Sequence, residues 1–305
     1  MNSPVIISCG GGKGGIGKST IVAFLGTFLA QQGYRVGFVD ADLGGANLHQ
    51  YLGVRRPAKG LTEFLSGKIK NLFDASIETN VPNTWLICGS GDNMASANPK
   101  FVQKQKLIQQ IKQLPADFIL VDLGAGTNIH VTDFYAAYQY SLLLSDGLPA
   151  SIENAYGFLK NGLMRGLMRQ IPAHHEIHDY FRKFSTGTAG SEFVTLEEMI
   201  AACAKQFPRE ARSMKLWLHQ KKNFLIVNMV REREPISRCL KFAEVVRKYL
   251  GISVDYIGYV IFSSSISGSV LRSEPIALSN QDAQMTACVT SLCKNLIALT
   301  RGDTS

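Results

Sequence analysis

The chain has 305 residues, 46% hydrophobic and 18% charged, enough to bury the core of one large domain. No apolar run approaches the roughly 20 residues that a membrane-spanning helix needs, and the N-terminus shows no signal-like segment, so we expect a cytoplasmic protein, or one attached peripherally to membrane or nucleoid. The cysteines occur singly, without a CxxC pair, so we expect no disulfide framework, zinc site or iron–sulfur cluster. We expect these cysteines to be small buried residues: Cys9, Cys88, Cys203, Cys239, Cys288 and Cys293.

The formal net charge of +8 is concentrated in one segment. Between Lys160 and Lys248 there are 17 Lys or Arg against 9 Asp or Glu, a balance of +8, and the remaining 15 and 15 cancel. This excess is either a solvated helical face or a surface for an anionic partner, such as DNA, an acidic protein or anionic lipid.

Strands and helices alternate along most of the chain. Short apolar, β-branched runs predict strands at residues 4–9, 34–45, 84–89, 116–126, 140–146, 223–230 and 255–262. Helical spacing of apolar residues predicts helices over 19–33, 99–114 and 236–251, and another that begins near Ala150. This order predicts an α/β fold with a doubly wound, mostly parallel sheet flanked by helices.

One region interrupts the alternation. Residues 160–222 contain no clear strand, and Thr195 with Glu198 forms a capping box in front of a helical pattern. We therefore predict a single domain over residues 1–305 that contains a basic helical insertion at 160–222; a separately folding domain is the alternative. A flexible loop is expected at residues 184–192.

The stretch GGGKGGIGKST, residues 10–20, lies between the first predicted strand and the first predicted helix. It fits the phosphate-loop pattern G-x-x-x-x-G-K-[ST] at Gly12, Gly17, Lys18 and Ser19. In such a loop backbone N–H groups and the helix N-terminus bind phosphates, the lysine reaches the β- and γ-phosphate oxygens, and the Ser hydroxyl can bind Mg²⁺. The predicted nucleotide-binding residues are Gly12, Lys13, Gly14, Gly15, Ile16, Gly17, Lys18, Ser19 and Thr20.

Three carboxylates lie where predicted strands end. Asp122 ends FILVD, and Asp40 and Asp42 end VGFVDAD. Carboxylates at the carboxyl ends of strands beside a phosphate loop can hold a metal and orient an attacking water. We therefore predict a magnesium nucleotide site here.

These segments resemble the SIMIBI-class P-loop ATPases of the MinD/ParA type. KGGIGKS, residues 13–19, is similar to their deviant Walker A motif, whose hallmark is the extra lysine, here Lys13. VDADLGGANLHQYLG resembles their switch I, closest to that of the flagellar-number regulators FlhG, FleN and YlxH, and FILVDLGAG resembles their Walker B and switch II. LPASIENAYGFLK, IVNMV and YIGYVIF are similar to later family segments. The resemblance covers about 240 residues and lapses over the insertion.

The resemblance implies roles for individual residues. Lys18 and Ser19 would bind phosphate and Mg²⁺, Asp40 and Asp122 would act on Mg²⁺ through its waters, and Asp42 would orient the attacking water. Asn228 matches the family's adenine-recognising asparagine, and Asn47 would lie near the dimer interface. Lys13 would cross to the nucleotide of a second subunit, as an arginine finger does in other phosphoryl-transfer enzymes, which implies an ATP-dependent homodimer.

The sequence departs from the family in three places. Ile261 stands where a proline of the adenine loop is expected. The last helix, residues 287–305, has only Lys294 and Arg301 as basic residues, so we expect it to pack in the core rather than bind a membrane. The basic insertion is absent from the common MinD or FlhG pattern, and we expect it to bind a regulatory protein.

The leading hypothesis is thus a slow, partner-stimulated, Mg²⁺-dependent ATPase, binding ATP and ADP, that regulates the position or number of a cellular structure. A second hypothesis makes DNA the partner, as in ParA-type partition proteins. An iron–sulfur carrier or reductase of the same fold is a third, disfavoured because the expected cysteines are absent. A degenerate binding protein that does not hydrolyse ATP is a fourth, disfavoured because the motif lysines and carboxylates are present.

Overall fold

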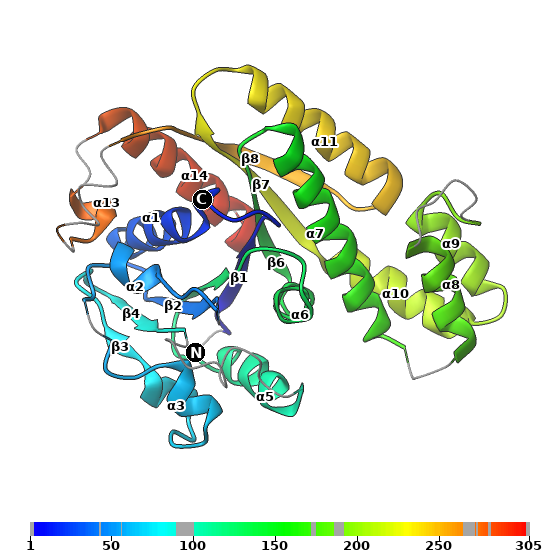
Figure 1. The fold of residues 1–305 in the computed structure, drawn as a ribbon, viewed down its shortest axis with the longest axis horizontal. Coiled ribbons are helices and arrows are strands. Elements are labelled where there is room, and N and C mark those ends of the chain that lie inside the picture. The colour runs from blue at the N-terminus through cyan, green and yellow to red at the C-terminus, as the bar shows by residue number, and fades with distance from the viewer. Residues whose placement is uncertain are drawn as a thin grey trace.

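An eight-stranded sheet runs through the centre of the molecule (Figure 1). The computed structural model describes residues 3–42, 44–55, 57–89, 101–171, 175–185, 192–264, 272, 274–279 and 282–302. The strand order is β3-β4-β2-β5-β1-β6-β7-β8, and every neighbouring pair is parallel except β3 with β4. The strands are β1 (Val5–Gly10), β2 (Val36–Ala41), β3 (Ile77–Glu78), β4 (Thr84–Ile87), β5 (Phe118–Leu123), β6 (Tyr140–Ser145), β7 (Lys222–Val230) and β8 (Val254–Ile261).

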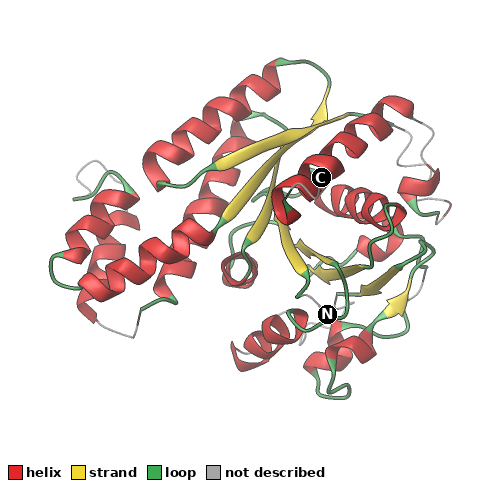
Figure 2. Cartoon of the chain, turned by 180° about the vertical axis from the view of Figure 1, so that it is seen from behind, coloured by secondary structure: helices red, strands yellow, loops and turns green. Residues whose placement is uncertain are grey.

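Helices cover both faces of the sheet, as Figures 1 and 2 show from opposite sides. On one face α1 (Lys18–Gln31), α13 (Ile276–Ser279) and α14 (Ala283–Arg301) enclose one hydrophobic cluster with the sheet. On the other, α5 (Phe101–Ile111), α6 (Ile129–Ala137), α7 (Pro149–Met168) and α11 (Glu234–Leu250) enclose a second. Two buried layers around a parallel sheet confirm the predicted doubly wound fold.

The elements that the sequence did not predict are short or lack a one-sided pattern. They are β3, α2 (Leu48–Tyr51), α3 (Leu61–Leu65), the 3₁₀ helix η1 (Leu72–Ala75), α6 and α13. In α6, all six residues of the run 131–136 are buried. A helix that is buried nearly all round has no polar stripe, so the 3.6-residue periodicity that identifies a surface helix is missing.

The region between β6 and β7 is helical in its described part. It contains α7, α8 (His175–Ser185), α9 (Leu196–Ala204) and α10 (Pro208–Gln220), and Figure 1 shows α8 to α10 projecting beyond the end of α7. The capping box is present, because the Glu198 N–H donates to the Thr195 hydroxyl and the Glu198 carboxylate accepts from the Thr195 N–H, each at 3.1 Å. The expected loop at 184–192 lies mostly outside the described residues. The division into one domain with an insertion stays a prediction.

The last helix packs in the core, as predicted. Along α14, Met285, Val289, Leu292, Cys293 and Leu296 are buried in the cluster shared with α1. Five of the six cysteines are buried, and Cys288 is half-buried. Among the described residues, no helix is both long and apolar enough to cross a bilayer.

A buried carboxylate joins three of these helices. Asp133 of α6 is fully buried and accepts hydrogen bonds from the guanidinium groups of Arg165 and Arg169 of α7, each at 2.6 Å. Lys104 of α5 also forms an ion pair with it. Although burial opposes ionisation, the hydrogen bonds from Arg165 and Lys104 lower the pKa of Asp133.

Replacing Asp133 with alanine is expected to lower the free energy of unfolding by about 3–5 kcal/mol, because three cations lose their shared partner. Urea denaturation followed by circular dichroism measures this change. The matched control is Asp179→Ala, which removes an exposed ion pair with Arg182 and should cost less than about 1 kcal/mol. Since the pKa of Asp133 is depressed in the fold, its contribution is present at neutral pH and is lost as the pH falls below about 4. Equal effects of the two variants would contradict the structural role given to Asp133.

Candidate nucleotide site

The predicted site residues meet at the carboxyl ends of three neighbouring strands. Strand β5 lies between β2 and β1, and its Asp122 is in register with Asp40 of β2 on one side and Cys9 of β1 on the other. The loop that follows β1 leads directly into α1, which starts at Lys18. Parallel pairing therefore places the phosphate loop beside the two carboxylates, at the edge of the sheet where ligands bind in such folds.

The phosphate loop presents its backbone rather than side chains. No side chain of the described residues caps the N-terminus of α1, so its first N–H groups remain available for an anion. The N-cap residue Gly17 has φ 82°, and a Cβ there would lie 2.4 Å from Nδ2 of Asn228. Glycine is required at this position for both backbone conformation and space. The Gly126 N–H donates to the Gly12 carbonyl at 2.9 Å, which ties the loop after β5 to the phosphate loop.

Asn228 supports the loop from β7. Its side chain is 5% exposed, and its Nδ2 donates to the Ile16 carbonyl at 2.8 Å. The next residue, Met229, has φ 58° and lies at a register shift between β7 and β8. An αL conformation at a residue other than glycine is strained, and such strain concentrates at functional sites. The adenine role of Asn228 stays a prediction, as does that of the loop after Ile261, which continues outside the described residues.

The two lysines of the loop differ in environment. Lys18 is only 8% exposed, and its Nζ donates to the Lys13 carbonyl at 3.2 Å, inside the loop. The Lys13 side chain is 39% exposed, and its Nζ lies 3.7 Å from Oδ2 of Asp146, which directly follows β6. Lys18 is thus directed into its own loop, whereas Lys13 is accessible from outside the chain.

Asp122 and Asp40 are buried acids. Burial raises the pKa of both carboxyls above the ordinary aspartate range, and the neighbouring Asp122 raises that of Asp40 further. Ser19 hydrogen-bonds to Asp122, yet Oδ1 of Asp122 is buried and has no hydrogen-bond partner in the part of the chain that the structure describes. An unpartnered carboxylate oxygen beside a Ser hydroxyl offers the hard oxygen ligands that Mg²⁺ prefers. These residues therefore fit a magnesium ion.

Asp40 and Asp42 have different surroundings. The oxygens of Asp40 accept from the N–H groups of Asp42, at 3.2 Å, and Leu48, at 3.1 Å, so Asp40 fixes the turn into α2. Asp42 is half-buried, and its Oδ1 accepts from the Gly44 N–H at 3.3 Å. A Cβ at Gly124 would lie 3.0 Å from Oδ1 of Asp42, so this glycine lets the loop after β5 approach it closely. Asn47, at the N-cap of α2, is exposed.

Sequence reasoning missed two residues of the site, Asp146 and Met229. Asp146 ends the predicted strand YSLLLSD, so the same strand-end rule that identified Asp40 and Asp122 applies to it. No sequence signal indicates the αL conformation of Met229, because a methionine rarely adopts it.

Comparisons with known proteins agree with this geometry. The family model described as "CobQ/CobB/MinD/ParA nucleotide binding domain" matches residues 7–276. The flagellum site-determining protein YlxH of Helicobacter pylori is 35% identical over 49% of this chain and 50% of its own length. The antiactivator FleN of Pseudomonas aeruginosa is 33% identical over 52% of this chain and 57% of its own. The chain thus spans about half the length of the curated relatives it matches.

The fold is also that of solved structures. The cell division ATPase MinD of Pyrococcus furiosus superposes with a TM-score of 0.64 at 21% identity, over 97% of this chain and 99% of that one. MinD of Pyrococcus horikoshii, solved with Mg-ADP, superposes with a TM-score of 0.63 at 19% identity over 97% of each chain. The phosphate loop, the strand-end carboxylates and a family match over residues 7–276 together show that this chain belongs to the CobQ/CobB/MinD/ParA nucleotide-binding domain family.

Proposed function

We propose that this protein is an ATP-dependent dimerising switch that hydrolyses ATP to ADP and phosphate. One observation carries the proposal: the phosphate loop holds two lysines, of which Lys18 is buried within the loop and Lys13 is accessible. A buried lysine suffices for binding phosphates within one chain. An accessible second lysine at the same loop can neutralise charge on a nucleotide held by another subunit.

The phosphate loop would bind the nucleotide through its backbone N–H groups, the α1 N-terminus and Lys18. Ser19 and Asp122 would hold Mg²⁺, with Asp40 behind them, and the ion would neutralise charge on the phosphates. That MinD of Pyrococcus horikoshii was solved with Mg-ADP supports this ligand pair. Asn228 would both hold the loop and contact the base through its remaining amide oxygen.

Hydrolysis needs a water positioned in line with the γ-phosphorus. The water oxygen forms a bond to that phosphorus, the bond from it to the bridging oxygen of ADP breaks, and the water's protons are released to solvent or phosphate. Asp42 is placed to orient the water, since its half-buried carboxylate lies beside the loop after β5. Asp40 and Asp122 are less suited, because both are buried.

The edge that carries Lys13 also exposes apolar side chains. Ile129, which follows β5, is 52% exposed, and Leu148, which follows β6, is 50% exposed. Both come after carboxyl strand ends, on the same edge as the phosphate loop. Exposed apolar residues around an accessible catalytic lysine favour an isologous contact with a second copy.

The similarity to YlxH and FleN supports a cellular role in regulating the position or number of a cellular structure.

A regulatory protein partner would bind the basic helices between β6 and β7. On α10, Arg209, Arg212 and Lys215 are exposed, and none forms an ion pair with the described residues. The same residues support the second candidate, a DNA partner, which steeply salt-dependent binding would identify.

The test is the oligomeric state of the wild-type protein. Gel filtration with light scattering is expected to give a monomer with ADP and Mg²⁺, and a dimer with a non-hydrolysable ATP analogue and Mg²⁺. A matched control omits Mg²⁺, which should reduce the dimer fraction. The same elution with both nucleotides, despite measured binding of each, would refute the switch.

A further inference from the structure

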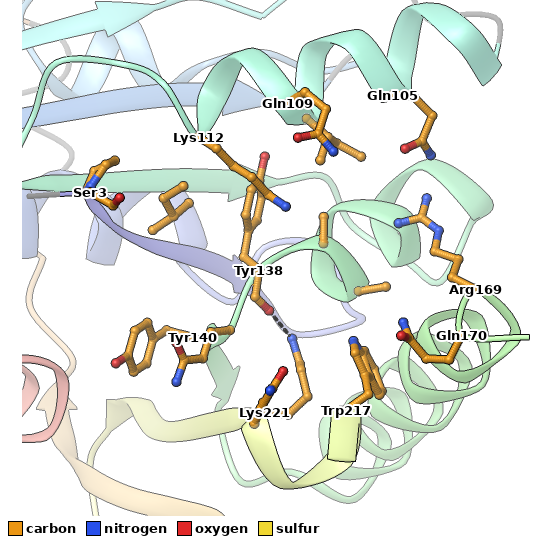
Figure 3. Close-up of a pocket in the computed structure, with 17 residues that line it drawn as sticks. Ser3, Gln105, Gln109, Lys112, Tyr138, Tyr140, Arg169, Gln170, Trp217 and Lys221 are labelled. Carbon is orange, nitrogen blue, oxygen red and sulfur yellow. Dashed lines mark hydrogen bonds between the residues drawn. The ribbon is translucent and has the colours of Figure 1, made fainter. Parts of the chain in front are cut away.

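A cavity opens at the opposite edge of the sheet from the phosphate loop. It has a volume of about 820 Å³ and lies where β1, β6 and β7 begin. Its walls come from α5, the turn between α6 and β6, and the C-terminal ends of α7 and α10 (Figure 3). This volume is within the range of about 300–1,000 Å³ typical of small-molecule sites.

The lining of the cavity is cationic and rich in donors. Its charged residues are Lys112, Arg169 and Lys221, and none of the described residues that line it is acidic. Five glutamines add amide groups: Gln105, Gln109, Gln139, Gln170 and Gln220. Figure 3 shows Arg169 and Lys221 on opposite sides of Trp217. A lining of this kind favours an anion with several acceptor oxygens.

Lys221 is a buried lysine that no carboxylate of the described residues pairs with. It is 7% exposed, and its Nζ donates to the carbonyls of Tyr135, at 2.7 Å, and Tyr138 at the C-terminal end of α6. It forms no ion pair with any described residue. Burial lowers the pKa of Lys221 to about 7. The two carbonyls explain its position as a helix C-cap, and its Nζ also lies over the rings of Tyr135 and Trp217, 4.2 and 5.7 Å from their centroids. A bound anion would favour its charged form.

Tyr138 is another residue that lines the same cavity. Its side chain is 3% exposed, and its hydroxyl is buried with no hydrogen-bond partner among the described residues. Figure 3 shows its ring running from the Lys221 side of the cavity toward α5, where Lys112 and Gln109 lie. Buried hydroxyls nearly always have a partner, so this one needs an explanation. The hydroxyl itself is buried away from the open cavity, so it is not counted among the groups that would bind a ligand there.

The surroundings carry further excess positive charge. Three cations share the single carboxylate of Asp133, and one of them, Arg169, also lines the cavity. With Lys221, four basic side chains therefore contact α6, and among these contacts Asp133 is the one carboxylate that balances their charge. In a partly buried region such an excess attracts an anion strongly, because solvent screens it less.

We propose that this cavity binds a phosphorylated small molecule of nucleotide size, at a site separate from the phosphate loop. Lys112, Arg169 and Lys221 would bind its phosphate oxygens. The glutamines and the Trp217 ring would contact its uncharged part. The proposal is independent of ATP hydrolysis, since no residue of the phosphate loop takes part.

Trp217 gives a local signal for the test. The chain has two tryptophans, and the other, Trp85 of β4, packs against Phe73 with ring centroids 5.5 Å apart, away from the cavity. In a Trp85→Phe variant, pyrophosphate or AMP is expected to change the Trp217 fluorescence saturably. Binding of pyrophosphate alone would indicate recognition through phosphate groups, and tighter binding of AMP would indicate contacts to its base or sugar. Should Trp85→Phe fail to fold, the difference between the wild type and Trp217→Phe supplies the same signal.

Lys112→Glu is expected to weaken this binding about tenfold or more, because one charge-assisted contact is replaced by a repulsive one. Lys106→Glu is the matched control. Lys106 lies on α5, Lys112 directly follows that helix, and both are exposed, but Lys106 stacks over Phe64 outside the cavity. It should change affinity less than about twofold, and Lys18→Ala should leave the signal unchanged. Three outcomes would overturn the proposal. The two lysine-to-glutamate variants could weaken binding equally, or Lys18→Ala could abolish the signal. The third is that neither probe binds up to ~10 mM by fluorescence and equilibrium dialysis.

Discussion

Replacing Lys13 with alanine is expected to lower ATP turnover by about a thousandfold while ATP affinity changes less than about threefold. A cation inserted in trans stabilises charge that develops on the phosphates in the transition state, so its loss reduces the rate more than it reduces binding. Lys18 remains in this variant and continues to bind phosphates from within the loop. Phosphate release measures turnover, and titration with a fluorescent nucleotide measures affinity.

The intramolecular ion pair of Lys13 calls for a control. The Lys13 Nζ lies 3.7 Å from Oδ2 of Asp146, so Lys13→Ala also removes this pair. Asp146→Asn removes the charge of the partner and keeps Lys13. If Lys13 acts across the dimer, Asp146→Asn should retain turnover and ATP-dependent dimerisation, whereas Lys13→Ala loses both. Normal turnover in Lys13→Ala, or the same loss in both variants, would contradict the role in trans.

Much of the fold follows from local sequence patterns. Each long strand lies within a predicted range or extends one residue beyond it, because strands buried on both faces read as continuous apolar runs. The phosphate loop was identifiable because its pattern and its strand-loop-helix setting occur together. Asp40 and Asp122 lie side by side because β2 and β5 are neighbours in the sheet. The alternation of strands and helices in the sequence does not specify this strand order.

Other features depend on contacts between distant segments. The ion cluster around Asp133 joins α5, α6 and α7, and nothing near Asp133 in the sequence indicates that three cations converge on it. The same holds for the cavity at Lys221, whose walls come from segments more than 200 residues apart, from Ser3 to Lys221. Asn228 also shows the limit of reasoning from motifs. The family resemblance predicts that it contacts the adenine base, whereas its hydrogen bond to the Ile16 carbonyl is seen only in the structure.

Replacing Asp42 with alanine is expected to reduce hydrolysis by at least about a hundredfold and to let an ATP-bound dimer accumulate. The variant removes the half-buried carboxylate that we assign to the attacking water, and it leaves Lys13, Lys18 and the buried pair Asp40 and Asp122 in place. ATP should then still assemble the dimer, but the step that releases it is lost. Gel filtration with light scattering after incubation with ATP and Mg²⁺ measures the trapped dimer.

Asp40→Asn serves as the comparison for Asp42→Ala, because the two carboxylates are close in sequence but differ in surroundings. Asp40 accepts from the Leu48 N–H at 3.1 Å, so its replacement should disturb the turn into α2 and lower thermal stability. Asp42→Ala removes only an exposed contact with the Gly44 N–H and should leave thermal stability nearly unchanged. A stable Asp42→Ala protein that binds ATP yet remains monomeric would show that ATP does not assemble this chain. Because Lys13→Ala and Asp42→Ala predict opposite dimer populations with ATP, the pair separates loss of assembly from loss of hydrolysis.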